Sequence, residues 1–113
     1  MTTTELASAR GVANRYIELV SAGDLEGVAA LFRPDATLIH PLGRFAGRRA
    51  IRTYYAEHIL PQGFQLVAVS FLDDERCCAF ELEATSPGSL THAIDHLTVD
   101  AHGRIQRLAI YYR

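Results

Sequence analysis

The sequence predicts an α+β fold, because helical patterns fill the first half of the chain and strand patterns fill the second. In the first half, apolar residues recur every three or four positions, the spacing of one buried helix face. In the second half, segments rich in β-branched and aromatic residues are separated by turn residues. The chain has 113 residues and 49% hydrophobic content, enough for one core, so we expect one domain over residues 1–113.

Three helices are predicted, and the residues between them fit the ends of helices. Gly23 is well suited to follow the last turn of the first helix, and Asp24 to cap the start of the second. The helices are expected at residues 5–22, at the short segment between Asp24 and the break at Pro34–Asp35, and at residues 48–60.

Strand patterns follow in an order that suits an antiparallel meander. They are expected at residues 36–40, 64–72, 76–85, 90–100 and 104–112. Such a sheet must bury one face against the helices. A strongly curved sheet forms a cone with a pocket at its open end, whereas a flatter one forms a two-layer sandwich.

Charge and composition narrow the classes of partner. The net charge is −2 and basic residues form no stripe, so we expect neither nucleic acid nor a membrane surface as a partner. No apolar run reaches the roughly 20 residues of a membrane span, and the N-terminus lacks the pattern of a signal peptide. A cytoplasmic protein is therefore expected. Cys77 and Cys78 are adjacent in a strand pattern and should point to opposite faces, so no disulfide between them is expected.

Three residues carry chemistry in this pattern. Tyr16 lies on the apolar face of the first helix, His40 ends a strand at a His-Pro pair, and Asp95 interrupts an apolar strand face. Burial among apolar neighbours raises the pKa of a carboxyl, and a protonated carboxyl can donate a hydrogen bond to an oxyanion. The alternatives are a core tyrosine for Tyr16, a backbone-bonded histidine for His40, and for Asp95 an ion pair with an arginine such as Arg15.

Several segments carry a family pattern: residues 15–32, 35–37, 41–43, 47, 50–52 and 93–97. Together they resemble the ketosteroid isomerases of the NTF2-like superfamily, which also holds SnoaL-type cyclases, limonene-epoxide hydrolases and scytalone dehydratase. The resemblance implies an NTF2-like cone, with three N-terminal helices packed on a curved antiparallel sheet. It also implies a homodimer packed through the sheets.

The resemblance assigns roles to residues of this chain. Tyr16 matches the oxyanion-hole tyrosine, Asp95 the aspartic acid that stays protonated and donates the second hydrogen bond, and Tyr55 the tyrosine that supports the first. The family's general base is an aspartate directly before a Pro-x-Gly turn, and here that position is His40. Neutral imidazole can accept a proton from a carbon acid or a water.

We therefore expect isomerase-like proton transfer on a small apolar carbonyl compound, with His40 as base and no cofactor or metal. We expect Tyr55, Phe32 and Leu97 to contact the substrate. One alternative is a SnoaL-like cyclase, an epoxide hydrolase or a dehydratase. Another is a non-catalytic ligand-binding or dimerisation module, which a cavity collapsed around Phe32, Phe45 and Phe64 would favour.

Overall fold

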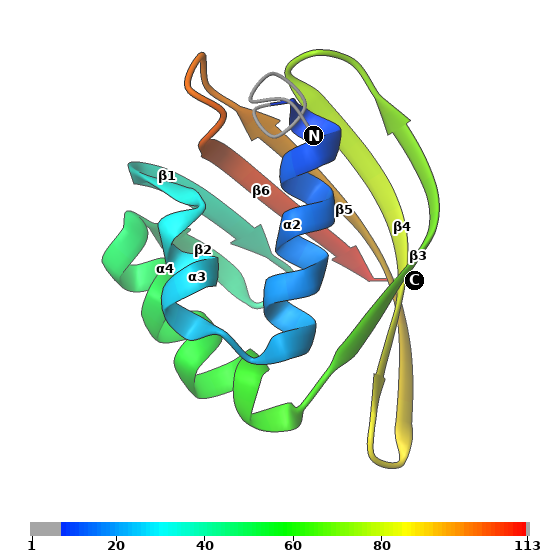
Figure 1. Cartoon of the computed structure of the whole chain (residues 1–113). Helices are drawn as coiled ribbons and strands as arrows, with labels where there is room; N and C mark the ends of the chain where they lie inside the picture. The colour runs from blue at the N-terminus through cyan, green and yellow to red at the C-terminus, as the bar shows by residue number, and fades with distance from the viewer. Residues whose placement is uncertain (1–7, 113) are drawn as a thin grey trace.

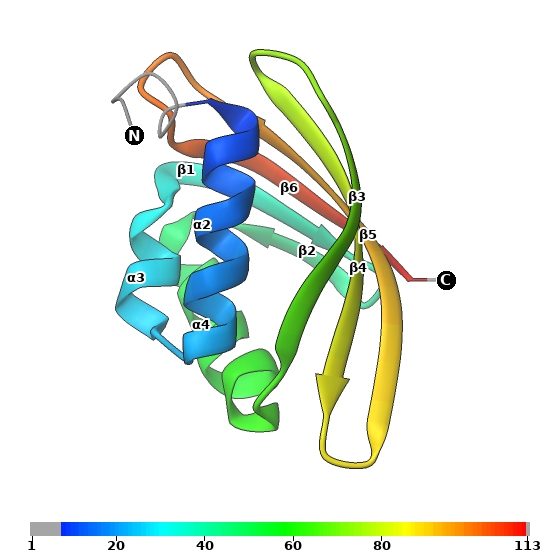
Figure 2. The ribbon, with the colours of Figure 1, turned by 45° about the vertical axis from the view of Figure 1, so that its right-hand side comes forward.

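The computed structural model describes residues 8–112, and its helices lie together on one side of a curved sheet (Figures 1 and 2). The helices are α2 (Ala9–Ala22), α3 (Leu25–Ala30) and α4 (Arg48–Tyr54). Helix α2 lies across the concave face of the sheet, and α3 and α4 pack beside it (Figure 2). The predicted arrangement of three helices on a curved sheet is confirmed.

Six strands form the sheet in the order β2-β1-β6-β5-β4-β3, which leaves β2 and β3 as open edges. Four of the five strand pairs are antiparallel, and the predicted meander from β3 to β6 is confirmed. The β1–β6 pair is parallel, so the sheet is mixed rather than wholly antiparallel. The strands are β1 (Phe32–His40), β2 (Gly43–Ala46), β3 (Gln65–Asp73), β4 (Cys77–Ser86), β5 (Ser89–Val99) and β6 (Ile105–Tyr112).

Strand β1 begins earlier than predicted and passes through Pro34. Phe32 already pairs with Ile105, and the register of the β1–β6 pair shifts between Phe32 and Thr37. Pro34 falls in this irregular stretch, where its missing N–H removes no bond from a regular ladder. The short strand β2, which returns antiparallel to β1 after the turn at Pro41, was not predicted.

The first two helices follow the predicted signals at their ends. Gly23 follows α2 with a φ of 71°, and the Asp24 carboxylate accepts a hydrogen bond from the backbone N–H of Gly27 at 2.9 Å. The Ser8 hydroxyl caps α2 by accepting from the Gly11 N–H at 3.0 Å. Residues 5–7 of the predicted first helix lie outside the described residues.

The third predicted helix is not a single α-helix. After α4 the chain widens into a π-helical turn, η1 (Tyr55–Ile59), and tightens into a 3₁₀ turn, η2 (Leu60–Gln62). The change begins between two consecutive tyrosines, and both Tyr54 and Tyr55 are buried. Single π turns often mark functional sites, and this one begins at the second of two buried neighbouring tyrosines.

The core fills the space between the helices and the concave sheet face. Alternation along β5 is as predicted, because Ala93, Asp95, Leu97 and Val99 are all buried. Cys77 and Cys78 are both free thiols, so the expectation of no disulfide between them is confirmed. Within residues 8–112, no helix has the length and apolar character needed to span a membrane.

Candidate functional site

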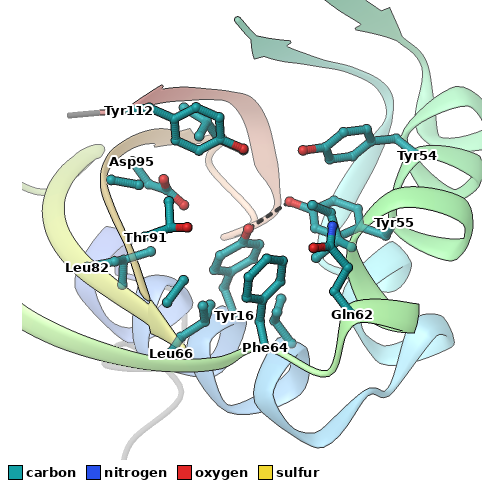
Figure 3. Close-up of a pocket in the computed structure, with 15 residues that line it drawn as sticks. Tyr16, Tyr54, Tyr55, Gln62, Phe64, Leu66, Leu82, Thr91, Asp95 and Tyr112 are labelled. Atoms are coloured by element: carbon teal, nitrogen blue, oxygen red, sulfur yellow. Dashed lines mark hydrogen bonds between the residues drawn. The ribbon is translucent and has the colours of Figure 1, made fainter. Parts of the chain in front are cut away.

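A cavity of about 420 Å³ opens between α2, the η1–η2 turns and the concave face of the sheet (Figure 3). Small-molecule sites commonly measure about 300–1,000 Å³. Its polar lining consists of four tyrosines, Asp95, Gln62 and Thr91. The rest of the wall is largely apolar and includes Val20, Ile59, Phe64, Leu66, Leu82 and Ile110. The cavity is therefore open, and not collapsed around phenylalanines.

Two buried tyrosines share a hydrogen bond at one wall of the cavity. The hydroxyls of Tyr16, from α2, and Tyr55, from η1, are 2.7 Å apart, and the two rings meet edge to face (Figure 3). Burial raises the pKa of Tyr16, and the negative charge of nearby Asp95 raises it further. Burial also raises the pKa of Tyr55. Both hydroxyls therefore keep their hydrogens, and only one hydrogen is used between them. The other is available to a ligand.

Asp95 presents a buried carboxyl to the same cavity (Figure 3). It lies in the middle of β5, paired with Phe80 on one side and Ile110 on the other. Only 2% of the residue is exposed, and its Oδ1 atom has no hydrogen-bond partner within the described part of the chain. Burial raises the pKa of Asp95 to about 7. At neutral pH the carboxyl is therefore protonated about half of the time and can then donate.

The alternative ion pair of Asp95 with Arg15 is not formed. The guanidinium of Arg15 instead lies 3.2 Å from the carboxylate of Glu18, one turn along α2 on an exposed surface. Among the residues that the structure describes, no arginine, lysine or histidine lines the cavity. The buried carboxyl is therefore not held in its charged form by a cation, which agrees with its raised pKa.

His40 lies behind the cavity wall rather than on it. Its Nε2 is 2.5 Å from the Tyr112 hydroxyl, and its Nδ1 accepts a hydrogen bond from the backbone N–H of Leu42 at 3.1 Å. Burial lowers the pKa of His40, and the neighbouring His58 lowers it further, so the ring is neutral at neutral pH. Because Nδ1 accepts, the single ring proton belongs on Nε2, and His40 donates to Tyr112.

The structure thus brings Tyr16, Tyr55 and Asp95 to one cavity. It places His40 outside the cavity wall, behind Tyr112. Phe32 and Leu97, which we expected to contact the substrate, are wholly buried in the core and do not line the cavity. Phe32 packs behind Tyr55, with ring centroids 6.1 Å apart. Among residues 8–112, no three histidine, cysteine, aspartate or glutamate side chains gather closely enough to hold a metal ion.

Two cavity tyrosines, Tyr54 and Tyr112, were missed by sequence reasoning. Alternation along β6 carried the signal for Tyr112, because it shares a sheet face with buried Ile110 and Leu108. The helical spacing carried a signal for Tyr54, because Ile51, Tyr54 and Tyr55 share one apolar stripe of the predicted third helix. In the structure Tyr54 ends α4, Tyr55 begins the π turn, and both side chains line the cavity.

Comparison with known proteins identifies the family of this fold. The family model of the SnoaL-like domain matches residues 13–108. A steroid Δ-isomerase of Nocardioides simplex is 29% identical over 111 residues, covering 94% of this chain and 90% of that protein. A 42-residue segment is 52% identical to the epoxide hydrolase LasB of Streptomyces lasalocidi, covering 35% of this chain and 15% of that enzyme.

Solved structures of the same fold include a candidate ketosteroid isomerase of Kribbella flavida. Its TM-score is 0.83 at 22% identity, over 93% of this chain and 77% of that one. The epoxide hydrolase/cyclase-like enzyme SalBIII superposes with a TM-score of 0.82 at 20% identity, over 93% of this chain and 90% of that one. At these identities the likeness establishes the fold alone.

The burial of the Asp95 carboxyl predicts how the free energy of unfolding depends on pH. The pKa of Asp95 is raised from 3.8 to about 7 in the folded protein, so the folded state holds the proton more tightly than the unfolded state does. The resulting contribution to the free energy of unfolding is complete below about pH 4 and is lost as the pH rises to about 7. Relative to the parent, Asp95→Asn should therefore gain stability over this window, by up to roughly 4 kcal/mol. Urea unfolding of both proteins from pH 4 to pH 8 measures the difference.

The control is Asp74→Asn, in the turn after β3. Backbone N–H groups of Arg76 and Cys77 lower the pKa of the exposed Asp74 carboxyl, so this variant should show no gain at high pH. Parallel pH profiles for the parent and Asp95→Asn would mean that Asp95 is ionised in the folded protein.

Proposed function

The chain belongs to the SnoaL-like domain family, and we propose that it catalyses ketosteroid-isomerase-like proton transfer on a small apolar carbonyl compound. In this proposal the carbonyl oxygen of the substrate sits between Tyr16 and the neutral form of Asp95. Both donate hydrogen bonds to the oxygen as it gains negative charge in the enolate. Preorganised donors of this kind lower the barrier because they need no rearrangement when the charge develops.

The observation that carries the proposal is the buried carboxyl of Asp95, whose Oδ1 has no partner among residues 8–112, in the same cavity as the Tyr16–Tyr55 pair. A buried polar atom without a partner is costly in a folded protein, and an oxygen atom of a ligand would satisfy it. The apolar wall fits an apolar body, and a lining without a cation among the described residues fits a ligand that enters uncharged. Proton transfer with electrostatic stabilisation needs no cofactor.

The proton acceptor predicted from the sequence is His40, and this role stays a prediction. A base must come within hydrogen-bond reach of the proton that it removes. His40 reaches the cavity only past the Tyr112 hydroxyl, and its ring proton already lies on Nε2. To act as the base, the ring would have to release both contacts. The glutamine and leucine variants below separate a base from a residue that holds Tyr112.

Epoxide opening is a second candidate, favoured by the segment shared with LasB and by the protonated carboxyl. Ring opening requires an acid at the epoxide oxygen, and neutral Asp95 can supply that proton while water or a substrate hydroxyl attacks the carbon. The Asp95 carboxylate then takes up the proton that the attacking oxygen releases. A ligand-binding module without catalysis uses the same cavity but leaves every substrate unchanged. The activity measurement below distinguishes the three functions.

We also propose a homodimer packed through the outer sheet face, as in the family. This face exposes Val67, Leu72, Leu90, Ile94 and Tyr111. Light scattering coupled to size exclusion should give twice the 12.5 kDa chain mass, and Ile94→Glu should give a monomer. A monomeric parent would exclude the dimer.

The oxyanion pair predicts how a phenolate binds. With a phenol acidic enough to stay ionised throughout, Tyr16→Phe and Asp95→Ala should each weaken binding by about 1.5–3 kcal/mol, the range for a hydrogen bond to a charged group. Binding to the parent should also weaken as the pH rises through about 7, because Asp95 then loses its proton. Calorimetric titration measures both effects, with Tyr111→Phe, on the exposed sheet face, as the control. Unchanged affinity in both cavity variants would contradict the pair.

Activity on a 3-oxo-Δ5-steroid tests the reaction. The conjugated product is followed by absorbance, and Tyr16→Phe should lower kcat by about 10²–10³-fold. If His40 is the base, His40→Gln and His40→Leu should both lose about 10²–10⁴-fold. If His40 only donates to Tyr112, glutamine should retain activity and leucine should not. Turnover of an apolar epoxide in place of the steroid would favour the second candidate, and turnover of neither would favour the binding module.

A further inference from the structure

We propose that the cavity binds a second oxygen of its ligand between the hydroxyls of Tyr54 and Tyr112, and that His40 is a positioning residue for Tyr112. The inference rests on the proposed function, because it names the substrate class of the same cavity. That class is small, mostly apolar molecules with two oxygen functions, one at Tyr16 and Asp95 and one at Tyr54 and Tyr112.

Tyr54 supplies the first half of this second site. Its ring is buried against the rings of Phe45, Tyr55 and His40. Its hydroxyl is buried and makes no hydrogen bond of standard geometry among residues 8–112, although the Tyr112 hydroxyl approaches it as a weak partner. Burial raises the pKa of Tyr54, so the hydroxyl keeps its hydrogen. An aromatic cluster thus fixes in place a donor that lines the cavity and that a ligand oxygen would satisfy better than Tyr112 does.

Tyr112 supplies the second half of the site, and its contact with His40 determines whether its hydroxyl donates or accepts at the cavity. The Leu42 N–H occupies Nδ1 of His40, so Nε2 carries the proton and donates it to the Tyr112 hydroxyl. The tyrosine oxygen is the acceptor in that bond, and its own hydrogen must point elsewhere. Tyr112 lines the cavity with its ring half exposed. Its hydroxyl is therefore held at the cavity with a hydrogen to donate.

The two hydroxyls face one another across the cavity, on the side away from Tyr16 (Figure 3). The two donor pairs are Tyr16 with Asp95 and Tyr112 with Tyr54. In each pair the first tyrosine is hydrogen-bonded to a further group, Tyr16 to the Tyr55 hydroxyl and Tyr112 to the His40 ring. The two backing contacts come from different elements, η1 and the end of β1. Two donors that converge on one space suit an acceptor oxygen, such as a carbonyl, a hydroxyl, an ether or an epoxide.

An apolar group at this position would leave the buried Tyr54 hydroxyl with only its weak contact to Tyr112, which is unfavourable. Sites built to hydrogen-bond a ligand oxygen discriminate strongly against analogues that lack it. The Tyr54–Tyr112 pair should therefore select among ligands that bind Tyr16 and Asp95 equally well.

The test compares 2-naphthol with the isomeric dihydroxynaphthalenes that carry their second hydroxyl on the other ring. The readout is the ratio of the two affinities for each protein, measured by titration calorimetry. For the parent, at least one isomer should bind about tenfold more tightly than 2-naphthol, on the order of one or two hydrogen bonds. In Tyr54→Phe and in Tyr112→Phe this ratio should fall to within about twofold of one.

His40 is tested by the same ratio. His40→Gln retains an N–H donor for Tyr112 and should preserve the preference for the diol, whereas His40→Leu should lose it. Tyr111→Phe, the neighbouring exposed tyrosine, should not change the ratio. Thermal unfolding of each variant shows that the folded protein is being titrated.

A parent that prefers no diol, or a preference that survives in both Tyr54→Phe and Tyr112→Phe, would overturn the inference. The proposed function fails separately, if Tyr16→Phe and Asp95→Ala leave phenolate affinity unchanged. A diol preference that depends on Tyr54 and Tyr112 would then still establish the second oxygen site.

Discussion

The burial of a carboxyl without a counter-charge is the constraint on which the rest of this cavity depends. Asp95 cannot leave the interior, because the alternation of β5 fixes it on the same face as Leu97 and Val99. No lining residue in the described part of the chain carries a positive charge. The cavity therefore favours neutral groups, and the tyrosine hydroxyls around Asp95 keep their hydrogens because burial raises the pKa of each. Negative charge that develops on a ligand can be stabilised here only by hydrogen-bond donors. Such a site suits a delocalised oxyanion formed inside it better than a ligand that arrives charged.

The hydrogen bonds that Tyr55 makes to Tyr16 and His40 makes to Tyr112 determine which hydroxyl hydrogens point into the cavity. Tyr16 and Tyr55 have two hydroxyl hydrogens and one bond between them, so one hydrogen remains for a ligand. Tyr112 receives the His40 proton, so its own hydrogen remains as well. Chains of hydrogen bonds polarise one another in a low-dielectric interior, and each backing group should make the exposed donor stronger. This arrangement lowers the stability of the fold, since Asp95 Oδ1 is buried without a partner in residues 8–112 and the buried Tyr54 hydroxyl has only a weak contact with Tyr112. Each such group costs about 1–3 kcal/mol, which is large beside the marginal stability of a small domain.

Much of the fold and half of the candidate site could be predicted from residues that act locally. Gly23 and Asp24 end and begin helices through their own backbone and side chain, so these boundaries needed no tertiary information. Asp95 was found because a carboxyl on an apolar strand face conflicts with its surroundings. Three features depended on contacts distant in sequence. The second helix ends before Pro34 as predicted, but β1 already begins at Phe32, and the β1–β6 register shift accommodates the proline. The parallel pair joins β1 to β6, with most of the chain between them. The π turn Tyr55–Ile59 replaces the predicted α-helix where the chain packs on the sheet, and it has no residue signature of its own.

Histidine at position 40 changes the electrostatics of the cavity beyond the loss of one carboxylate. An aspartate there would place an acidic group behind Tyr112, whose hydroxyl lines the same cavity as Asp95, and like charges disfavour each other's ionisation. With a neutral imidazole that bonds to Tyr112 and Leu42, the raised pKa of Asp95 is due to burial alone. Asp95 is then the group lining the cavity whose pKa, about 7, lies closest to neutral pH. Below that pH it is a hydrogen-bond donor; above it, it is a carboxylate that can accept a proton. Because an effective acid or base has a pKa near the working pH, the same residue can serve either role. The tyrosines donate on both sides of this transition, so the charge of one side chain decides which chemistry the cavity favours.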